Sequence, residues 1–437
     1  KAYKFWLFFI ALSSHSFFSR LMKGCLIIKK IFILFLKIRT LEIDIDNFLK
    51  EEEIPLIIRH WNRILNIKLG WIHDFDKLIS KYVCAINIFI FDFFRLSSKL
   101  LKTFTEHTTL VTSIDCSTFG DGQFICSGSG DKTVCVWDAG TNKRIQSFNG
   151  HSNDVKCVKF SPYHYHNYRR NVICSSADEI DILFWDIKNN QQLKVFNQHT
   201  DGVSSIEFSS FNGGRYLCSG SYDNTIRLWD VETSKSLHVF DEHKDWIFSV
   251  DISSSQSNNN KNSNIGVIGG NGYTICSASR DRTIRIWDIE TTKQLIVFKG
   301  HAYAVNSVKY GSNESLNTVL SGSSDKSVRL WDIRSGQQIQ VFNGHTETIN
   351  EVAYSQFVIH DSEGDDTSNV VCSAAGNTIR FWDIRSNKNE LYMINGDEED
   401  EMCCLAFMQL KKKSNDNRGS GIHLCYGTYK GLLHIWG

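Results

Sequence analysis

Residues 217–230 read LCSGSYDNTIRLWD, and nearly the same phrase returns at 275–288 as ICSASRDRTIRIWD and at 319–332 as VLSGSSDKSVRLWD. The tryptophan of the phrase occurs seven times: Trp137, Trp185, Trp229, Trp287, Trp331, Trp382 and Trp436. An aspartate follows it in the first six copies. A histidine, often after a glycine, lies upstream in those six copies, and Asp397 stands at that place in the seventh. The chain therefore repeats one unit seven times.

The third copy shows what the unit should look like. Apolar residues alternate imperfectly in 201–210, and the runs RYLCSGS, TIRLWD and SLHVF that follow are rich in β-branched and aromatic residues. Glycine, aspartate and asparagine stand between these runs, where turns need them. Four strands per copy, with neighbouring tryptophans 44 to 58 residues apart, are typical of propeller blades.

The repeated GH and WD marks resemble those of the WD-repeat β-propeller family in its regular seven-bladed form. The resemblance covers about residues 99–437 and implies an all-β fold, a seven-bladed β-propeller. The chain ends after the third strand of the last copy, whereas 99–104 (KLLKTF) precedes the first histidine as SLHVF precedes His243. We expect 99–104 to be the outer strand of blade seven, so that the ring closes without a free sheet edge.

In this family a histidine, a serine, an aspartate and the tryptophan of each blade form a buried hydrogen-bonded set. Such a set has to be complete, because one orphaned buried group costs ~1–3 kcal/mol. By position, blades one, three, four and five have complete sets: His107, Ser127, Asp131, Trp137; His199, Ser219, Asp223, Trp229; His243, Ser277, Asp281, Trp287; and His301, Ser321, Asp325, Trp331. Because the set recurs in blade after blade, we interpret it as structural and not as a catalytic Ser–His–Asp triad.

Three blades depart from this pattern. Blade two has Glu179 at the aspartate position, and blade six is one residue short, with Gly376 there. Blade seven has Asp397, Tyr426 and Lys430 in place of the histidine, the serine and the aspartate. We expect blades six and seven to be the least stable part of the ring.

The top face is the face where the first strands begin, and in the family it receives peptides. The residue before the aspartate position and the two residues that flank the first apolar residue of each blade vary among the copies. We expect Tyr222 of blade three to lie beside Trp246 and Phe248 of blade four, with Arg280 nearby, as a binding hot spot. The other candidates for partner binding on this face are Asn306, Ser324, Asn350, Asp178 and Tyr429. The alternative is an ordinary propeller surface without a dedicated ligand.

Two further regions accompany the propeller. Residues 1–50 are a basic, apolar leader, with eight Lys/Arg and no acid in 1–39, and residues 51–98 should form an amphipathic helical extension. Long insertions follow the first strands, and their composition is typical of solvated loops on the opposite, bottom face. These insertions are at 162–171, 253–266, 357–369 and 409–421.

The composition argues against some classes of function and favours one type of compartment. Lys+Arg and Asp+Glu both total 48, which argues against direct nucleic-acid binding. Six cysteines that occupy one repeated position belong to different blades and should not pair, which favours a reducing, cytoplasmic or nuclear compartment. No motif indicates a cofactor, and the pair His164 and His166 is a weak metal pattern, so we expect neither a cofactor nor a metal.

The leading hypothesis is a non-enzymatic scaffold or adaptor that binds peptide segments of partner proteins as part of a multiprotein complex. One alternative is a membrane-associated regulator anchored through residues 1–39. The other is an enzyme that uses the propeller as its frame.

Overall fold

The computed structural model of the chain describes residues 94–95, 98–117, 123–253, 273–311, 317–355, 370–385, 390–409 and 422–437. The chain divides into two compact units, Lys1–Ile79 and Ser80–Gly437, and all described residues belong to the second. The expected leader (1–50) and nearly all of the expected helical extension (51–98) lie outside the described residues, so both stay predictions. Among the described residues, no helix is long and apolar enough to cross a membrane.

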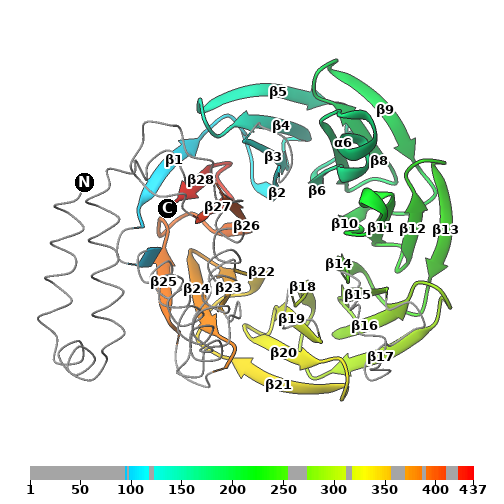
Figure 1. Cartoon of the computed structure of the whole chain (residues 1–437). Coiled ribbons are helices and arrows are strands. Elements are labelled where there is room, and N and C mark those ends of the chain that lie inside the picture. Colours follow the sequence, from blue (N-terminus) through cyan, green and yellow to red (C-terminus); the bar gives the residue numbers. More distant parts are fainter. Residues whose placement is uncertain are drawn as a thin grey trace, which may run out of the picture. The chain divides into compact units, whose positions relative to one another are not determined.

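Seven antiparallel sheets of four strands each form a ring, with the first strand of each sheet innermost (Figure 1). From the inner to the outer strand, blades one to three are β2 (Val111–Cys116), β3 (Phe124–Ser129), β4 (Thr133–Asp138), β5 (Lys143–Asn149); β6 (Val155–Phe160), β7 (Val172–Ala177), β8 (Ile182–Asp186), β9 (Gln191–Phe196); and β10 (Val203–Phe208), β11 (Tyr216–Ser221), β12 (Ile226–Asp230), β13 (Lys235–Phe240).

Blades four to six continue the same order. They are β14 (Ile247–Ile252), β15 (Thr274–Ser279), β16 (Thr283–Asp288), β17 (Gln294–Lys299); β18 (Val305–Tyr310), β19 (Thr318–Ser323), β20 (Val328–Asp332), β21 (Gln337–Phe342); and β22 (Ile349–Tyr354), β23 (Val370–Ala375), β24 (Thr378–Asp383), β25 (Tyr392–Asn395). Blade seven is β26 (Met402–Gln409), β27 (Ile422–Thr428), β28 (Leu433–Trp436) and β1 (Leu100–Phe104).

The two ends of the propeller sequence meet in blade seven. Strand β1 pairs antiparallel with β28, so that Thr103 lies opposite His434 and Phe104 opposite Leu433. The backbones of Lys99 and Gly437 exchange hydrogen bonds of 3.2 and 3.3 Å. This pairing confirms the predicted closure by residues 99–104 and the predicted seven-bladed, all-β fold.

Residue type explains which side chains fill the blades. The inner strand β10 buries Val203, Ile206 and Phe208, the alternation that the sequence indicated. The six cysteines of the repeated position in the second strands are buried and free, which confirms that they form no disulfide: Cys126, Cys174, Cys218, Cys276, Cys372 and Cys425. Each of them acts as a small apolar residue inside its own blade.

Neighbouring blades are held together by aromatic pairs. The outer strand of each blade ends in an aromatic or apolar residue three positions before the histidine position, and in six cases this residue is a phenylalanine. Its ring packs on the tryptophan of the next blade at centroid distances from 4.8 to 5.6 Å: Phe104–Trp137, Phe148–Trp185, Phe196–Trp229, Phe240–Trp287, Phe298–Trp331 and Phe342–Trp382. Blade six ends instead in Ile394, so the junction between blades six and seven lacks this aromatic pair.

The glycine of the GH mark has a packing role at the junctions between blades, as Gly150 shows between blades one and two. A Cβ atom added to Gly150 would lie 2.5 Å from Cη2 of Trp185, closer than side chains approach one another. Absence of a side chain at this position lets the indole ring reach the chain just before His151.

One sequence expectation about the bottom face was wrong. Residues 162–171 were expected to form a solvated loop, but Pro162–Tyr168 form helix α6, and Tyr163 and His164 are buried. Proline suits the first turn of a helix, and the helix packs on the short 3₁₀ turn η2 (Asn212–Gly214) of blade three. The expectation rested on the polar residues of this insertion. Its aromatic side chains provide the apolar surface that lets the helix pack against the propeller. The other three insertions lie mostly outside the described residues.

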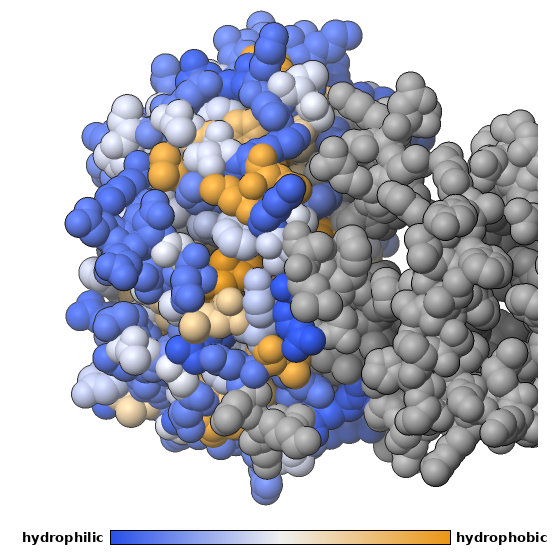
Figure 2. Space-filling model, turned by 90° about the vertical axis from the view of Figure 1, so that its left-hand side faces the viewer, coloured by the Kyte–Doolittle hydropathy of each residue, from blue (hydrophilic) through white to orange (hydrophobic). Residues whose placement is uncertain are grey.

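The rim exposes apolar residues only in small groups on the side that is visible in Figure 2. There, hydrophobic residues lie in small patches separated by hydrophilic ones. Exposed apolar residues of the outer strands, such as Ile145, Val195 and Ile339, come from different blades. Surface residues of this kind are normal on a monomeric protein and need no partner.

Replacing Phe104 by alanine should weaken the closed ring. Its ring is 6% exposed and lies 4.8 Å from that of Trp137, so the variant should lose about 3 kcal/mol of unfolding free energy. Denaturant unfolding of the full chain measures this loss. Leu100→Ala is the control, because Leu100 lies in the same strand but is 44% exposed, and it should cost about 0.5 kcal/mol or less. Equal losses for the two variants would contradict the role of this junction.

Candidate functional site

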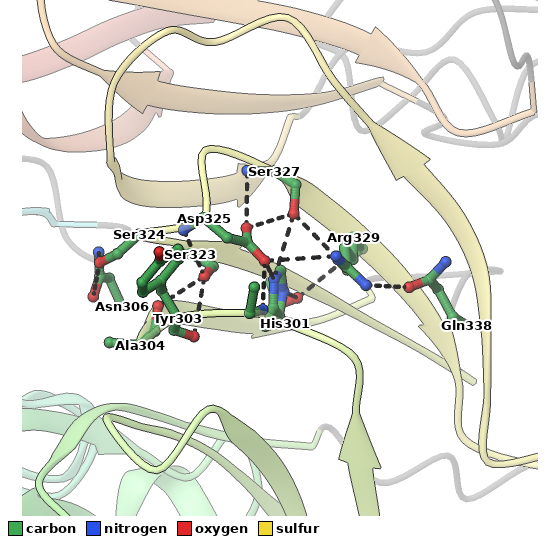
Figure 3. Close-up of polar contacts among 12 residues, drawn as sticks. His301, Tyr303, Ala304, Asn306, Ser323, Ser324, Asp325, Ser327, Arg329 and Gln338 are labelled. Carbon is green, nitrogen blue, oxygen red and sulfur yellow. Dashed lines mark hydrogen bonds and ion pairs between the residues drawn. The ribbon is translucent and has the colours of Figure 1, made fainter.

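The hydrogen-bonded set of blade five links its third strand to its top turn. Trp331 Nε1 donates to Ser321 Oγ at 2.8 Å, and Ser321 Oγ lies 2.8 Å from His301 Nε2. His301 Nδ1 lies 2.8 Å from Asp325 Oδ2 (Figure 3). Asp325 also accepts from the backbone amides of Ala302 and Ser327. The aspartate therefore fixes the turn that contains it against the segment that follows the histidine.

Blades one, three and four repeat this arrangement with the residues that the sequence placed there. The distances for the Trp–Ser, Ser–His and His–Asp contacts all lie between 2.7 and 2.9 Å: Trp137, Ser127, His107, Asp131; Trp229, Ser219, His199, Asp223; and Trp287, Ser277, His243, Asp281. The structure thus brings all four predicted sets together.

Proton positions follow from the donor inventory in blade four. The indole of Trp287 can only donate, so the hydroxyl of Ser277 accepts from it and is free to donate to His243 Nε2. His243 then carries its proton on Nδ1 and donates to the Asp281 carboxylate. Burial lowers the pKa of His243, and the positive charge of Arg285 lowers it further, which keeps the imidazole neutral.

The aspartates of these sets stay ionised. Burial alone would raise the pKa of Asp281, but the hydrogen bond from His243 and those from Thr283 and the Lys244 amide hold it well below its usual range. The same balance lowers the pKa of Asp131, Asp223 and Asp325. Each set is therefore a chain of donors that ends on a carboxylate.

Blade one differs in its electrostatics. Arginine stands two residues before the tryptophan in blades three to six, whereas Cys135 stands there in blade one. Burial tends to lower the pKa of His107, but hydrogen bonds with Asp131 and Cys135 raise it to about 9. At this pKa the imidazolium of His107 lies 2.9 Å from the Asp131 carboxylate.

Blade two completes its set with a longer acid. Glu179 Oε1 lies 2.5 Å from His151 Nδ1, and His151 Nε2 lies 2.6 Å from Ser175 Oγ. Trp185 Nε1 donates to Ser175 Oγ at 2.7 Å. Glu179 also accepts from the Ser152 amide, as the aspartates of the other sets do from the corresponding amide. Glu179 therefore completes the chain from tryptophan to acid despite its extra methylene.

Blade six keeps three members of the set and loses the carboxylate. His345 Nε2 lies 2.8 Å from Ser373 Oγ, which accepts from Trp382 Nε1 at 2.9 Å. His345 Nδ1 lies 3.3 Å from the Thr378 hydroxyl, a contact that blades one, three and five also have, but no carboxylate of the described residues is hydrogen-bonded to it. Burial and the charge of Arg380 lower the pKa of His345 to about 4. A neutral hydroxyl holds the turn less firmly than a carboxylate does.

Blade seven supplies its carboxylate from the other side of the turn. Trp436 Nε1 donates to the Tyr426 hydroxyl at 3.2 Å, and the Lys430 amide donates to Asp400 Oδ1 at 2.9 Å. Asp400, from the loop before β26, thus takes over part of the role of the missing aspartate. Its other oxygen, Oδ2, is buried and has no hydrogen-bond partner among the described residues. An orphaned buried oxygen is costly, so Asp400 replaces the missing aspartate only in part.

The sets offer no reachable nucleophile. Ser127, Ser219, Ser277 and Ser321 have no exposed surface. Each hydroxyl contacts a tryptophan and a histidine, and a substrate would have to displace both. In the part of the chain that the structure describes, no group of three or more His, Cys, Asp and Glu could hold a metal ion.

A cluster of charges at the centre of the ring was not recognised in the sequence. The fifth residue of the inner strands of blades one to five is charged: Asp115, Lys159, Glu207, Asp251 and Lys309. The recurrence of charged residues at one position of the inner strands was the sequence signal that could have predicted this cluster.

These central charges link blades. Glu207 of blade three lies 2.7 Å from the Lys159 amine of blade two and 3.9 Å from the Lys309 amine of blade five. Asp251 accepts from the Tyr310 amide of the next blade at 2.8 Å, and burial raises the pKa of Asp251 to about 6. The inner strands are thus joined by ions as well as by apolar contacts.

On the top face the turn and the start of the inner strand are tied together in the same way in successive blades. The amide of the residue before the aspartate position donates to the carbonyl of the residue before the inner strand. Tyr222 N donates to Gly202 O and Arg280 N to Trp246 O, both at 2.8 Å, and Ser324 N donates to Ala304 O at 2.9 Å. The structure therefore brings the sequence-predicted top-face positions side by side.

The predicted aromatic cluster is assembled across two blades. The Tyr222 ring centroid lies 4.7 Å from that of Trp246 and 6.2 Å from that of Phe248. The Arg280 guanidinium lies 4.8 Å from the centroid of Trp246. Trp246 is 40% exposed, so the cluster presents aromatic surface to solvent.

The other candidate residues divide into two groups. Asn306 and Asn350 donate through Nδ2 to carbonyls of the next blade, Ile349 O at 2.8 Å and Met402 O at 2.7 Å, so they bridge blades. Ser324 accepts from Asn306 at 3.1 Å. Tyr429 of blade seven is exposed, and Asp178 of blade two has a 44% exposed side chain; blade one lies between the two residues.

Comparison with known proteins gives the class of this chain. Six segments, 98–138, 142–186, 190–230, 234–288, 292–332 and 336–383, match the family model described as WD domain, G-beta repeat. Together they cover more than half of the chain, and the protein belongs to the WD40 repeat family. WD40 propeller proteins commonly act as protein-interaction scaffolds and are typically non-enzymatic.

Individual relatives match only parts of the chain. WD repeat-containing protein 82 of Drosophila melanogaster is 41% identical over 64 residues, 14% of this chain and 20% of that protein. The APC/C activator protein CDC20 of Saccharomyces cerevisiae is 30% identical over 111 residues, 25% of this chain and 18% of that protein. WD repeat-containing protein pop1 of Schizosaccharomyces pombe is 28% identical over 138 residues, 32% of this chain and 16% of that protein. The chain thus spans a fifth or less of the length of these three relatives.

Amide hydrogen exchange should rank the blades by the completeness of their sets. Blades six and seven should open first, because among the described residues His345 has no carboxylate partner and Asp400 Oδ2 has no hydrogen-bond partner. Mass spectrometry of the full chain, with peptides assigned to each blade, measures the rates. Earlier exchange in blades three to five would show that these sets do not govern local stability.

The titration of His345 should make the chain less stable in acid. Its folded pKa of about 4 lies below the ordinary 6.5, so its contribution is present above pH 6.5 and is lost as the pH falls towards 4. The loss should reach up to ~3 kcal/mol of unfolding free energy. His345→Gln, which does not titrate, is the comparison. Parallel stability curves for the two chains between pH 7 and pH 4 would rule out this contribution.

Proposed function

We propose that this chain is a non-enzymatic scaffold that binds peptide segments of partner proteins on the top face of its propeller. The observation that carries the proposal is the cluster of Tyr222, Trp246 and Phe248, which spans two blades and is partly exposed. Aromatic side chains that combine a large surface with few rotatable bonds are typical binding hot spots.

The contrast between constant and variable positions supports this site. The histidine, serine and tryptophan positions are held in hydrogen bonds inside the blades, where replacement is costly. The neighbouring positions on the top face carry Tyr222 in one blade, Arg280 in the next and Ser324 in the third. A rigid frame with variable exposed residues is the arrangement expected of a binding surface.

The proposal includes the cellular compartment of the protein and weighs two alternative functions. Buried free cysteines in six of the seven blades, all except blade five, suit a reducing compartment, and we place the protein in the cytoplasm or nucleus, within a multiprotein complex. The membrane-associated alternative rests on residues 1–39, which lie outside the described residues. The enzyme alternative has no support from the buried serines of the four sets.

A panel of short synthetic peptides, immobilised and probed with the full chain, tests the function. Peptides that bind the wild-type chain should lose about 30-fold in affinity for Trp246→Ala, because loss of a hot-spot aromatic costs about 2 kcal/mol or more. The triple variant Tyr222→Ala/Trp246→Ala/Phe248→Ala should lose at least as much.

Tyr168→Ala is the matched control for this experiment. Tyr168 is 57% exposed, but it belongs to α6, in the connection at the bottom end of β6. It should leave both binding and the thermal unfolding midpoint unchanged. Undiminished binding by Trp246→Ala and by the triple variant would move recognition away from this cluster and defeat the proposal.

A further inference from the structure

Three acidic residues border the aromatic cluster on the side of blades two and three. Asp154 and Asp178 belong to blade two, and the Asp178 amide donates to the Asp154 carbonyl at 2.8 Å, so the two residues are held together. Asp201 lies in the segment that leads into β10 of blade three, where its carboxylate accepts from the Gly202 amide at 2.7 Å. Three carboxylates therefore gather where blades two and three meet.

One amine only partly neutralises this border. The Lys156 amine lies 3.6 Å from Asp154 Oδ2 and 3.8 Å from Asp178 Oδ2. The side chains of Asp154 and Asp178 are 43% and 44% exposed, so both remain open to a partner. Against three carboxylates, a single lysine leaves an excess of two negative charges.

The acidic border and the aromatic cluster are in contact. A Cβ atom added to Gly202 would lie 2.5 Å from Asp178 Oδ1 and 2.9 Å from Cδ2 of Tyr222, so the carboxylate and the ring flank this glycine closely. Burial raises the pKa of Tyr222 to about 12, and the charges of Asp178, Asp201 and Asp154 contribute to the rise. The phenol is therefore neutral, and its ring lies in a negative potential.

The other side of the cluster already holds a cation. The Arg280 guanidinium lies 4.8 Å from the Trp246 ring centroid, and its Nε lies 3.9 Å from Asp245 Oδ2. Aromatic rings attract cations through their negative faces, and a carboxylate beside the ring adds to the attraction. This intramolecular contact shows that the cluster accommodates a positively charged group next to an acid.

Building on the proposed function, we infer that the peptide segment recognised here presents a lysine or arginine side chain. That side chain lies between the carboxylates of Asp154, Asp178 and Asp201 and the rings of Tyr222 and Trp246. The carboxylates neutralise its charge, and the rings cover its apolar stem. An acidic segment would meet the same border with repulsion. Blade five, in contrast, offers the uncharged Ser324 and Asn306 at the corresponding positions.

The test uses the full chain and three sets of synthetic peptides of equal length and equal apolar content, with net positive, zero or net negative charge. Binding is followed by fluorescence anisotropy at low and at physiological ionic strength. Positively charged peptides should bind tightest, and their affinity should fall as salt increases. The double variant Asp154→Asn/Asp178→Asn should lose about 10-fold in affinity for them and should respond less to salt.

Two further variants separate recognition from structural effects. Lys156→Gln removes the amine that neutralises the border, so it should raise the affinity for positively charged peptides, a gain that a damaged surface would not give. Glu290→Gln is the matched control, because Glu290 is an exposed acid in the β16–β17 turn at the bottom face, and it should change nothing. Thermal unfolding midpoints verify that each variant is folded.

The outcomes distinguish this inference from the function on which it rests. Neutral or acidic peptides that bind best, lose affinity in Trp246→Ala and are indifferent to Asp154→Asn/Asp178→Asn would overturn the inference and leave the peptide-binding function standing. Binding that survives Trp246→Ala would overturn both. A reduced affinity for positively charged peptides in Lys156→Gln would also overturn the inference.

Discussion

The buried indole of each blade is the contact on which the rest of the structure depends. In blade three, Trp229 packs on Phe196 of blade two at a centroid distance of 5.0 Å and donates its only proton to Ser219. One side chain thus serves the junction between blades and the hydrogen-bonded set within a blade. From Ser219 the set continues through His199 to Asp223, whose carboxylate also accepts from the amides of the turn. The outer rim and the top face are therefore mechanically connected.

The departures in three blades show which part of the set is indispensable. Every blade retains a tryptophan N–H donor and an oxygen that accepts from it, even where that oxygen is the phenol of Tyr426. The carboxylate is more variable: Glu179 supplies it in blade two and Asp400 in blade seven, whereas His345 of blade six has only the Thr378 hydroxyl beside its Nδ1 among the described residues. An unsatisfied indole N–H in the apolar junction has no alternative partner, whereas a turn near the surface can use water. The buried tryptophan and its acceptor are therefore kept in every blade, whereas the acid near the surface varies.

The repeat made most of the fold predictable, because the same pattern of strand and turn residues occurs in seven copies. The seven blades, the closing strand at 99–104 and the proximity of Tyr222, Trp246 and Phe248 all follow from matching positions between copies. Features outside the repeat pattern were harder to predict. Helix α6 depends on aromatic residues in an insertion that occurs in one copy only.

The central charges lie on the inner strands, where a sequence reading looks for apolar alternation and not for ions. Asn306 and Asn350 were assigned to the binding face from their position, but their amides also reach the next blade. A side chain at the edge of a narrow ring can serve the ring and the surface, and sequence position alone does not separate the two roles.

The same geometry explains why a binding surface can vary without loss of the fold. Tyr222 and Gly202 are joined through their backbones, by a hydrogen bond of 2.8 Å that any residue except proline could make at position 222. The side chains at the tips are therefore not needed for the turn, which Asp223 already holds from within. Substitution at the tips changes charge and shape while the frame stays fixed. Between blades two and four this freedom has placed three carboxylates and an aromatic cluster side by side, whereas the interior of those blades keeps the common set.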